Sequence, residues 1–66
     1  MTLKEFMNMA YGGRIDWEVS YFNGSDIQKF RGDGVYDPDL KNREVFGFGI
    51  SPGESDYAVI CTVAVK

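Results

Sequence analysis

The side chains in this chain that could do chemistry are mostly acids. Asp16 and Glu18 lie two residues apart, and a second group of acids gathers around Asp37. Two carboxylates can share the roles of acid and base, and clustered carboxylate oxygens can bind Ca²⁺. Cys61 is the single cysteine and histidine is absent, so the commonest zinc ligand and the commonest general base are missing. The elements that carry the acids decide whether they form a site.

The first acidic pair is better explained by strand pairing than by catalysis. Residues 14–22 alternate between polar and apolar side chains, which is typical of a half-buried strand. Asn23-Gly24 favours a two-residue type I′ turn and predicts a hairpin over residues 14–31. The facing pairs in this register are Trp17 with Phe30, Glu18 with Lys29, and Asp16 with Arg31. Since each acid then faces a cation, we interpret both as structural ion-pair partners.

The second acidic group lies in a predicted loop. Residues 31–43, RGDGVYDPDLKNR, are rich in Gly, Asp, Pro and Asn. Asp33, Asp37 and Asp39 do not have the spacing of an EF-hand, and Pro38 interrupts them. We expect Val35-Tyr36 to be exposed at the middle of this loop, where a tyrosine can anchor a partner or pack back on the sheet.

No other residue stands at a spacing that would activate it for catalysis. A nucleophile without a neighbouring base remains weak. Cys61 lies among Val and Ile and is interpreted as a small buried hydrophobe. The sequence therefore predicts no catalytic residues, no metal site, no cofactor and no enzymatic activity.

The N-terminus predicts a short helix. Thr2 and Glu5 have the spacing of a capping box. The residues of its apolar stripe are Leu3, Phe6, Met7 and Ala10. Gly12-Gly13 is expected to end the helix, which then covers residues 3 to about 10.

The C-terminal third predicts a second hairpin with one bulky face and one thin face. The strands are Glu44–Ile50 and Tyr57–Val65, joined by a four-residue loop, Pro52–Ser55. The facing pairs on the bulky side are Ile50 with Tyr57, Phe48 with Val59, and Phe46 with Cys61. Gly47 and Gly49 lie on the thin side, where they serve either sheet curvature or the close approach of a partner.

These elements predict one domain, residues 1–66, of the α+β class. A short N-terminal helix packs on a four-stranded, mostly antiparallel sheet made of two hairpins. The bulky faces must share a core whose strand residues are Ile15, Trp17, Val19, Tyr21, Phe30, Phe46, Phe48, Ile50, Tyr57, Val59, Cys61, Val63 and Val65. A helix of about 12 Å cannot cover four strands spaced about 4.8 Å apart. We expect the remainder to be covered by sheet curling or by another molecule.

The charge and the N-terminal sequence restrict the partners that are expected. The net charge is −3, with seven basic and ten acidic residues spread along the chain. No basic patch is present, so direct binding to nucleic acid is not expected. The N-terminus shows neither a signal peptide nor a membrane span. These features predict a soluble, cytoplasmic protein with no membrane partner.

Three segments resemble very short proteins of phages, prophages and mobile elements of Gram-positive bacteria. The segments are MTLKEFMNMA, IDWEVSYFNGSDIQKFRG and NREVFGFGISPGESDYAVICTVAVK. In that group a helix beginning M-T-L/V-K-E-L/F is followed by an N-G hairpin and an L-x-x-R-E-V element, which residues 40–45 match. Residues 32–38 are loop-like where the group has a short helical connection. The resemblance implies a phage accessory protein, a class that includes inhibitors of bacterial immunity, and transfers no catalytic residues.

The leading hypothesis is a non-enzymatic protein that binds and inhibits a host or phage protein, such as an anti-CRISPR acting on a nucleic-acid enzyme with a basic groove. The expected contact residues are Tyr11, Tyr21, Phe22, Asp33, Tyr36, Asp37 and Asp39. Two alternatives stay open. One is an oligomeric sponge that binds a signalling nucleotide through the cations Arg14, Arg31, Lys41 and Arg43. The other is a homo-oligomeric structural or regulatory module, a homodimer included.

Overall fold

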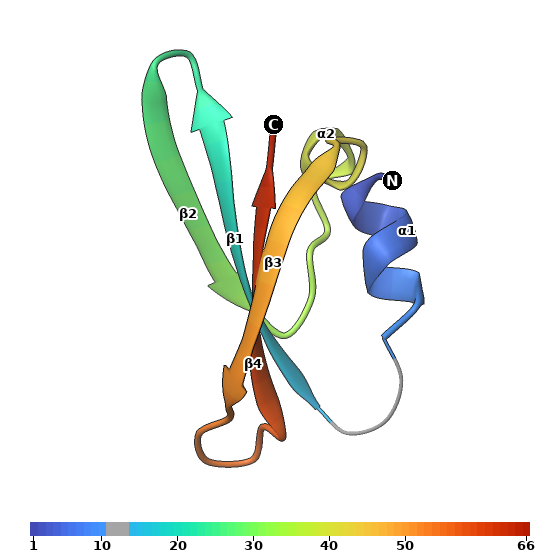
Figure 1. The fold of residues 1–66 in the computed structure, drawn as a ribbon, viewed down its shortest axis with the longest axis vertical. Coiled ribbons are helices and arrows are strands. Elements are labelled where there is room, and N and C mark those ends of the chain that lie inside the picture. Colours follow the sequence, from blue (N-terminus) through green and yellow to red (C-terminus); the bar gives the residue numbers. More distant parts are fainter. Residues whose placement is uncertain (11–13) are drawn as a thin grey trace.

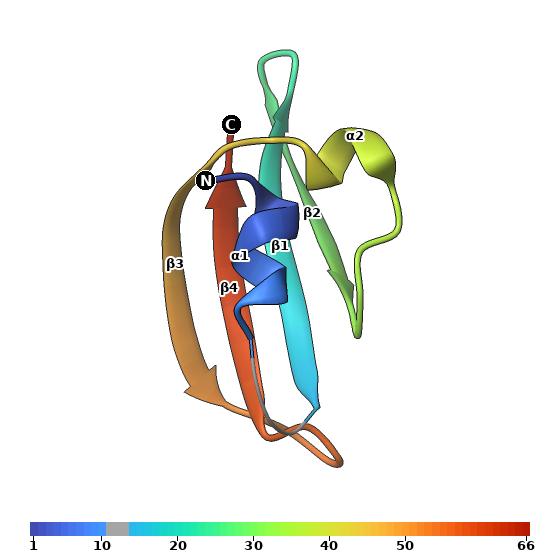
Figure 2. The same cartoon turned by 90° about the vertical axis from the view of Figure 1, so that its right-hand side faces the viewer.

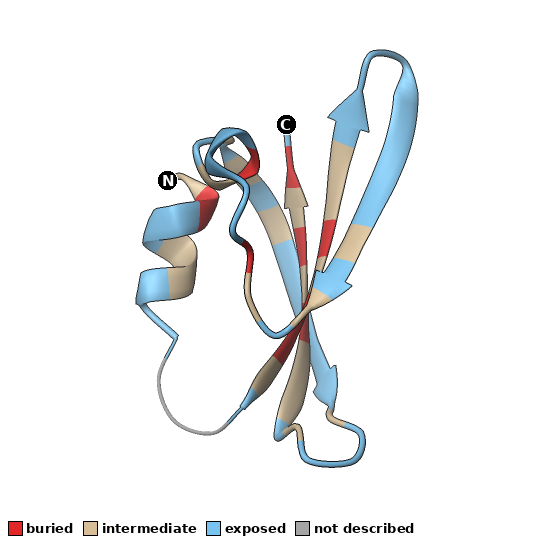
Figure 3. Cartoon of the chain, turned by 180° about the vertical axis from the view of Figure 1, so that it is seen from behind, coloured by how far each residue is buried: buried red, intermediate tan, exposed pale blue. Residues whose placement is uncertain are grey.

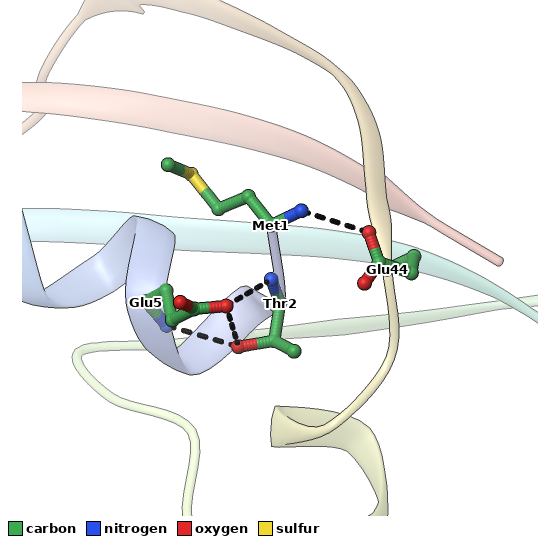
Figure 4. A network of polar contacts seen from close by, with 4 residues as sticks. All are labelled: Met1, Thr2, Glu5 and Glu44. Carbon is green, nitrogen blue, oxygen red and sulfur yellow. Dashed lines mark hydrogen bonds and ion pairs between the residues drawn. The ribbon is translucent and has the colours of Figure 1, made fainter.

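Helix α1 (Leu3–Asn8) is the first element of the chain, and its first turn is fixed by hydrogen bonds between Thr2 and Glu5. The computed structural model describes residues 1–10 and 14–66. Thr2 Oγ1 accepts a hydrogen bond from the Glu5 amide at 3.2 Å, and the Glu5 carboxylate accepts one from the Thr2 amide at 2.9 Å (Figure 4). The predicted capping box is therefore confirmed. The helix is slightly shorter than predicted, and the predicted stop at Gly12-Gly13 lies outside the described residues.

Four strands form one sheet, with both helices on the same face (Figures 1 and 2). The strands are β1 (Ile15–Asn23), β2 (Asp26–Gly32), β3 (Val45–Pro52) and β4 (Val59–Val65). Their order is β2-β1-β4-β3, so β2 and β3 are the edges. Each hairpin is antiparallel, and the central pair of β1 and β4 is parallel. The α+β class with two hairpins is confirmed, but the sheet is mixed, because one of its three strand pairs is parallel.

The connection between β2 and β3 accounts for the parallel pair. It runs along the helix side of the sheet and contains α2 (Pro38–Lys41), which Asp37 caps (Figure 2). The chain therefore returns to the end of the sheet at which β2 began, and β3 runs in the same direction as β2. Val35 and Leu40 of this connection are 3% and 5% exposed. The predicted loop is irregular over residues 33–37 but contains the helix α2, which was not predicted. The prediction of an exposed Val35 is wrong, because the connection supplies part of the core.

The register of the first hairpin differs by two residues from the predicted one. Asn23 pairs with Asp26, which leaves Gly24 and Ser25 as the central turn residues. Gly24 has a φ of 68° at the first central position, which fits a type II′ turn rather than type I′. The partners of Trp17 and Glu18 are therefore Gly32 and Arg31. A two-residue shift keeps every side chain on its predicted face.

The register of the second hairpin differs by four residues. Pro52, predicted to be the first loop residue, pairs with Val59 and so belongs to β3. The loop therefore spans residues 53–58 instead of the predicted Pro52–Ser55. Inside the loop the Tyr57 amide donates to the Glu54 carbonyl at 3.0 Å, and Ser55 has a φ of 53°. This local turn removes Tyr57 from the strand. The shift is again even, so Phe48 and Ile50 remain on the bulky face, opposite Val63 and Cys61.

The core lies between the central strands and the segments on the helix side. Leu3 of α1 is fully buried, and the Phe6 ring meets the Trp17 ring edge-on at 6.2 Å between centroids. Figure 3 shows that the buried strand positions fall on β1 and β4. The buried apolar residues are Leu3, Trp17, Val19, Val35, Leu40, Cys61, Val63 and Val65. The cover therefore buries residues of the two central strands and none of either edge strand, although Phe30 of β2 and Val45 of β3 pack against its rim.

Candidate interaction surfaces

The helix side of β3 carries the apolar surface that the cover leaves open. Phe48 and Ile50 are 62% and 66% exposed, and Met9 at the end of α1 is 61% exposed. We call Met9, Phe48 and Ile50 the edge surface. A groove of about 340 Å³ lies beside it, between α1 and β3, and all its lining residues are apolar. Phe6 closes one side of the groove, with its ring centroid 5.1 Å from that of Phe48.

The opposite side of β3 is thin because it carries Gly47 and Gly49. These glycines pair with Ala64 and Thr62 of β4. A Cβ built on either glycine would meet no atom within 4 Å, and neither glycine is among the residues with a positive φ. The packing within this chain therefore does not require glycine at positions 47 and 49. This open space agrees with both interpretations from the sequence, namely the close approach of a partner and the curvature of the sheet.

A small apolar patch adjoins the thin surface on the helix-free side of the sheet. Phe22, Ile27 and Phe46 are 46%, 63% and 58% exposed. They line a depression of about 320 Å³ together with Ala64 of β4. Phe22 and Ile27 are cross-strand partners, whereas Phe46 lies where the β3–β4 register shifts. We call Phe22, Ile27 and Phe46, with the two glycines of β3, the open-face surface.

The predicted aromatic contact residues do not form one surface. Phe22 belongs to the open-face surface. Tyr21 points to the helix side, packs against the core and lies under the Arg43 guanidinium at 5.2 Å. Tyr36 is 79% exposed beside α2, so it does not pack back on the sheet. Tyr11 lies outside the described residues.

The predicted acidic contact residues take part in intramolecular contacts. Asp37 Oδ1 accepts a hydrogen bond from the Asp39 amide at 3.0 Å and so caps α2. The Asp39 carboxylate lies 3.2 Å from Arg43 Nη2, and Asp33 lies 3.8 Å from Arg14. All three remain exposed. Their structural roles reduce the charge that they can offer to a partner.

Of the two acids on β1, Asp16 is held in a structural ion pair, whereas the predicted pairing of Glu18 with Lys29 is wrong, because Lys29 lies opposite Ser20. Asp16 is 7% exposed, and its Oδ2 accepts hydrogen bonds from Arg31 Nε at 2.9 Å and Nη2 at 2.7 Å. These hydrogen bonds raise the pKa of Arg31 above its ordinary value. The predicted Asp16–Arg31 pair therefore forms despite the register shift, because Arg31 reaches diagonally past Glu18, its direct partner.

The cations that a nucleotide sponge would need are largely in use. Arg31 is bound to Asp16, and Arg14 lies 4.7 Å from the centre of the Tyr57 ring and 3.8 Å from Asp56. Arg43 donates to the Phe22 carbonyl at 2.6 Å in addition to its contact with Asp39. Three of the four candidate phosphate ligands are thus held by the chain itself.

The remaining polar groups offer little chemistry. Cys61 is a free, buried thiol whose pKa is raised by burial, which disfavours the reactive thiolate. Within residues 1–10 and 14–66, no three His, Cys, Asp or Glu side chains are grouped to hold a metal ion. No helix in these ranges is long and apolar enough to cross a membrane.

Sequence reasoning assigned Phe48 and Ile50 to a bulky face but not to the contact residues, and it assigned no role to Met9 or Ile27. A signal for the edge surface is present in the sequence: the nine residues from Val45 to Gly53 carry no charge. The even register shift leaves Ile27 on the same face of the sheet as Phe22. The alternation of side chains in the hairpin could therefore have placed Ile27 beside Phe22 as an exposed apolar residue.

Comparisons with known proteins add no family to this description. No protein-family model matches the chain, and neither the curated proteins nor the solved structures gave a match.

Proposed function

We propose that this chain is a non-enzymatic binding protein that occupies a surface of a host or phage protein, as an accessory protein of a phage or mobile element. Inhibition of a bacterial defence enzyme is the activity that this class of protein would supply. The proposal rests on the resemblance to short phage proteins and on the open-face surface. It requires no catalytic group and no cofactor.

The open-face surface is the observation that carries the proposal. Isolated exposed apolar residues are ordinary, but adjacent ones beside a side-chain-free strip mark interaction sites. Phe22, Ile27 and Phe46 are about half exposed or more, and Gly47 and Gly49 leave room for a partner to lie directly on the backbone. Aromatic anchors around a flat centre are typical of protein interfaces.

Binding is tested by capture from a lysate of a Gram-positive host with tagged protein. Gly49→Gln fills the thin surface, and Ile50→Gln changes the adjacent residue on the opposite face of the same strand. We expect Gly49→Gln to remove the captured protein and Ile50→Gln to retain it. If neither change affects capture, or no specific protein is captured, the open-face surface is not the binding site.

The inhibitory activity is tested in cells. A phage targeted by a CRISPR system is plated on a host that expresses either the wild type or Gly49→Gln. We expect the wild type to raise the plaque count by several orders of magnitude and the variant to lose this effect. Equal plaque counts with and without the protein, in hosts that carry each available defence system, would refute the anti-defence role.

The nucleotide-sponge alternative is less supported, because Arg14, Arg31 and Arg43 already have partners in this chain. A thermal-shift titration with cyclic nucleotides tests it directly. A ligand that binds the folded state raises the melting temperature with its concentration. We expect no shift, and a saturable shift would favour the sponge.

A further inference from the structure

We propose that β3 pairs antiparallel with β3 of a second copy, forming one continuous sheet of eight strands, four from each chain, about a twofold axis at Gly49. This inference goes beyond the proposed function and does not depend on it. It starts from the position of β3 at the edge of the sheet, where no other strand of the described part of the chain pairs with its outer side and only the Val45 amide is bound, to the Met1 carbonyl. An uncharged, apolar edge strand is a template for another strand.

The other edge strand is protected, which makes β3 the edge that pairs. Strand β2 contains Asp26, Lys29 and Arg31, so a second copy would bring like charges together. Strand β3 contains no charge, and its residues are VFGFGISP. Natural sheets place charges on edges to prevent pairing, and β3 lacks this device.

The regular part of β3 is symmetric about Gly49. It is limited at one end by the register shift between Val45 and Gly47, and at the other by Pro52, which has no backbone N–H. The residues between these limits are 47–51, and Gly49 is their centre. An antiparallel pair centred there uses every regular residue of both strands.

This register also matches the side chains. Phe48 of one copy then faces Ile50 of the other, and the twofold axis repeats the contact. Aromatic and β-branched residues are favourable cross-strand partners. Gly49 faces Gly49 on the thin side, so no side chain separates the two backbones. Because the axis is perpendicular to the sheet, both α1 helices lie on the same face.

The apolar area is near that of a reversible dimer. Met9, Phe46, Phe48 and Ile50 are 58–66% exposed. If a large side chain presents about 150–200 Å² in total, each of them leaves roughly 100 Å² open. Two copies then offer about 800 Å² of apolar surface, to which the paired backbones add. Stable interfaces begin at about 1,000–1,200 Å², so we expect a dimer that dissociates on dilution.

The first experiment is light scattering on a sizing column from 1 mM to 1 μM. We expect a mass of twice 7.4 kDa at the highest concentration and the monomer mass at the lowest. Ile50→Lys should remain monomeric throughout, because it places a charge on the apolar pair. Ile27→Lys is the matched control, since Ile27 is 63% exposed on β2 and should leave dimerisation unchanged. A monomer at 1 mM, or loss of the dimer in the control alone, overturns the proposal.

The second experiment tests the register by cross-linking. In Gly49→Cys the two new Cβ atoms lie about 4.5–5.5 Å apart, close to what a disulfide needs. In Ser51→Cys, residue 51 of one copy faces residue 47 of the other, so the two new Cβ atoms are separated by four residues along the strand, about 13 Å. With copper phenanthroline as oxidant, we expect a covalent dimer from Gly49→Cys and none from Ser51→Cys. Equal cross-linking of both variants, or none from Gly49→Cys, rejects this register. Circular dichroism establishes that each variant is folded.

Discussion

Strands β3 and β4 are neighbours in one hairpin, and their side chains on the helix side have opposite environments. Val63 and Cys61 of β4 are 0% and 5% exposed, whereas Phe48 and Ile50, which face them across the pair, are 62% and 66% exposed. The composition of the two strands does not explain this difference, since both are apolar. The cover explains it, because the residues of α1 and of the connection with α2 bury the central strands, whereas Phe48 of β3 meets the Phe6 ring at the rim of this cover. Apolar side chains therefore stabilise the folded chain on β4, whereas on β3 they are available to contact another molecule.

The largest expected effect comes from removing the cover. Leu3 is fully buried, so Leu3→Ala leaves a cavity and should lower the free energy of unfolding by about 2–5 kcal/mol. Ile50→Ala on the exposed strand should cost less than about 1 kcal/mol. Urea denaturation at low micromolar concentration, where the proposed dimer is dissociated, measures both. Similar losses for the two variants would mean that β3 is as important to the monomer as the core.

A smaller effect separates two glycines of the second hairpin. A Cβ on Gly53 would lie 2.2 Å from the Tyr57 carbonyl oxygen, a backbone atom that cannot move without opening the loop. Gly53→Ala should therefore lower the free energy of unfolding by about 1–3 kcal/mol. Gly49→Ala enters open space and should change it by less than about 0.5 kcal/mol. Thermal and urea unfolding test this difference, and a costly Gly49→Ala would show that the thin side is packed within the monomer.

The helix cap should contribute a still smaller amount. Thr2→Ala removes the acceptor for the Glu5 amide and should lower the free energy of unfolding by about 1 kcal/mol. Thr2→Ser keeps a hydroxyl and should recover most of the loss. Urea denaturation of both variants makes the comparison. An equal loss in Thr2→Ser would indicate that the methyl group, and not the cap, supports α1.

The smallest effect is the pH dependence of the same cap. The hydrogen bonds from Thr2 lower the pKa of Glu5 below its ordinary value of 4.5. The stability that the carboxylate contributes is therefore fully present above pH 4.5 and is lost as the pH falls through the lower pKa of the folded state. The melting temperature of Glu5→Gln should depend less on pH than that of the wild type below pH 4.5. Parallel acid profiles would show that the cap does not need the charge.

Much of the local structure could be predicted, and the exceptions have a common cause. The capping box at Thr2 and Glu5 and both hairpins depend on contacts between residues close in sequence. The two registers were wrong by two and four residues, because Gly24 and the loop 53–58 adopt turns other than those expected. The contact residues were predicted only as candidates, and the structure distributes them over separate surfaces. An exposed Tyr36 and a buried Val35 differ by their tertiary neighbours, which alternation along the chain does not encode.

The sequence by itself determined which side chains share a face of the sheet. Side chains alternate with a period of two residues, and both register shifts were even, so the regular strand residues kept their predicted faces. Phe46 is the exception, because the irregularity between Val45 and Gly47 places it in the open-face surface instead of on the predicted bulky face. Only the tertiary structure decided the strand order, the parallel pairing of β1 with β4 and the extent of the cover. These features depend on where the connection with α2 crosses the sheet, and its apolar anchors Val35 and Leu40 find their place only against distant residues. The uncovered strand β3 is the result of that placement.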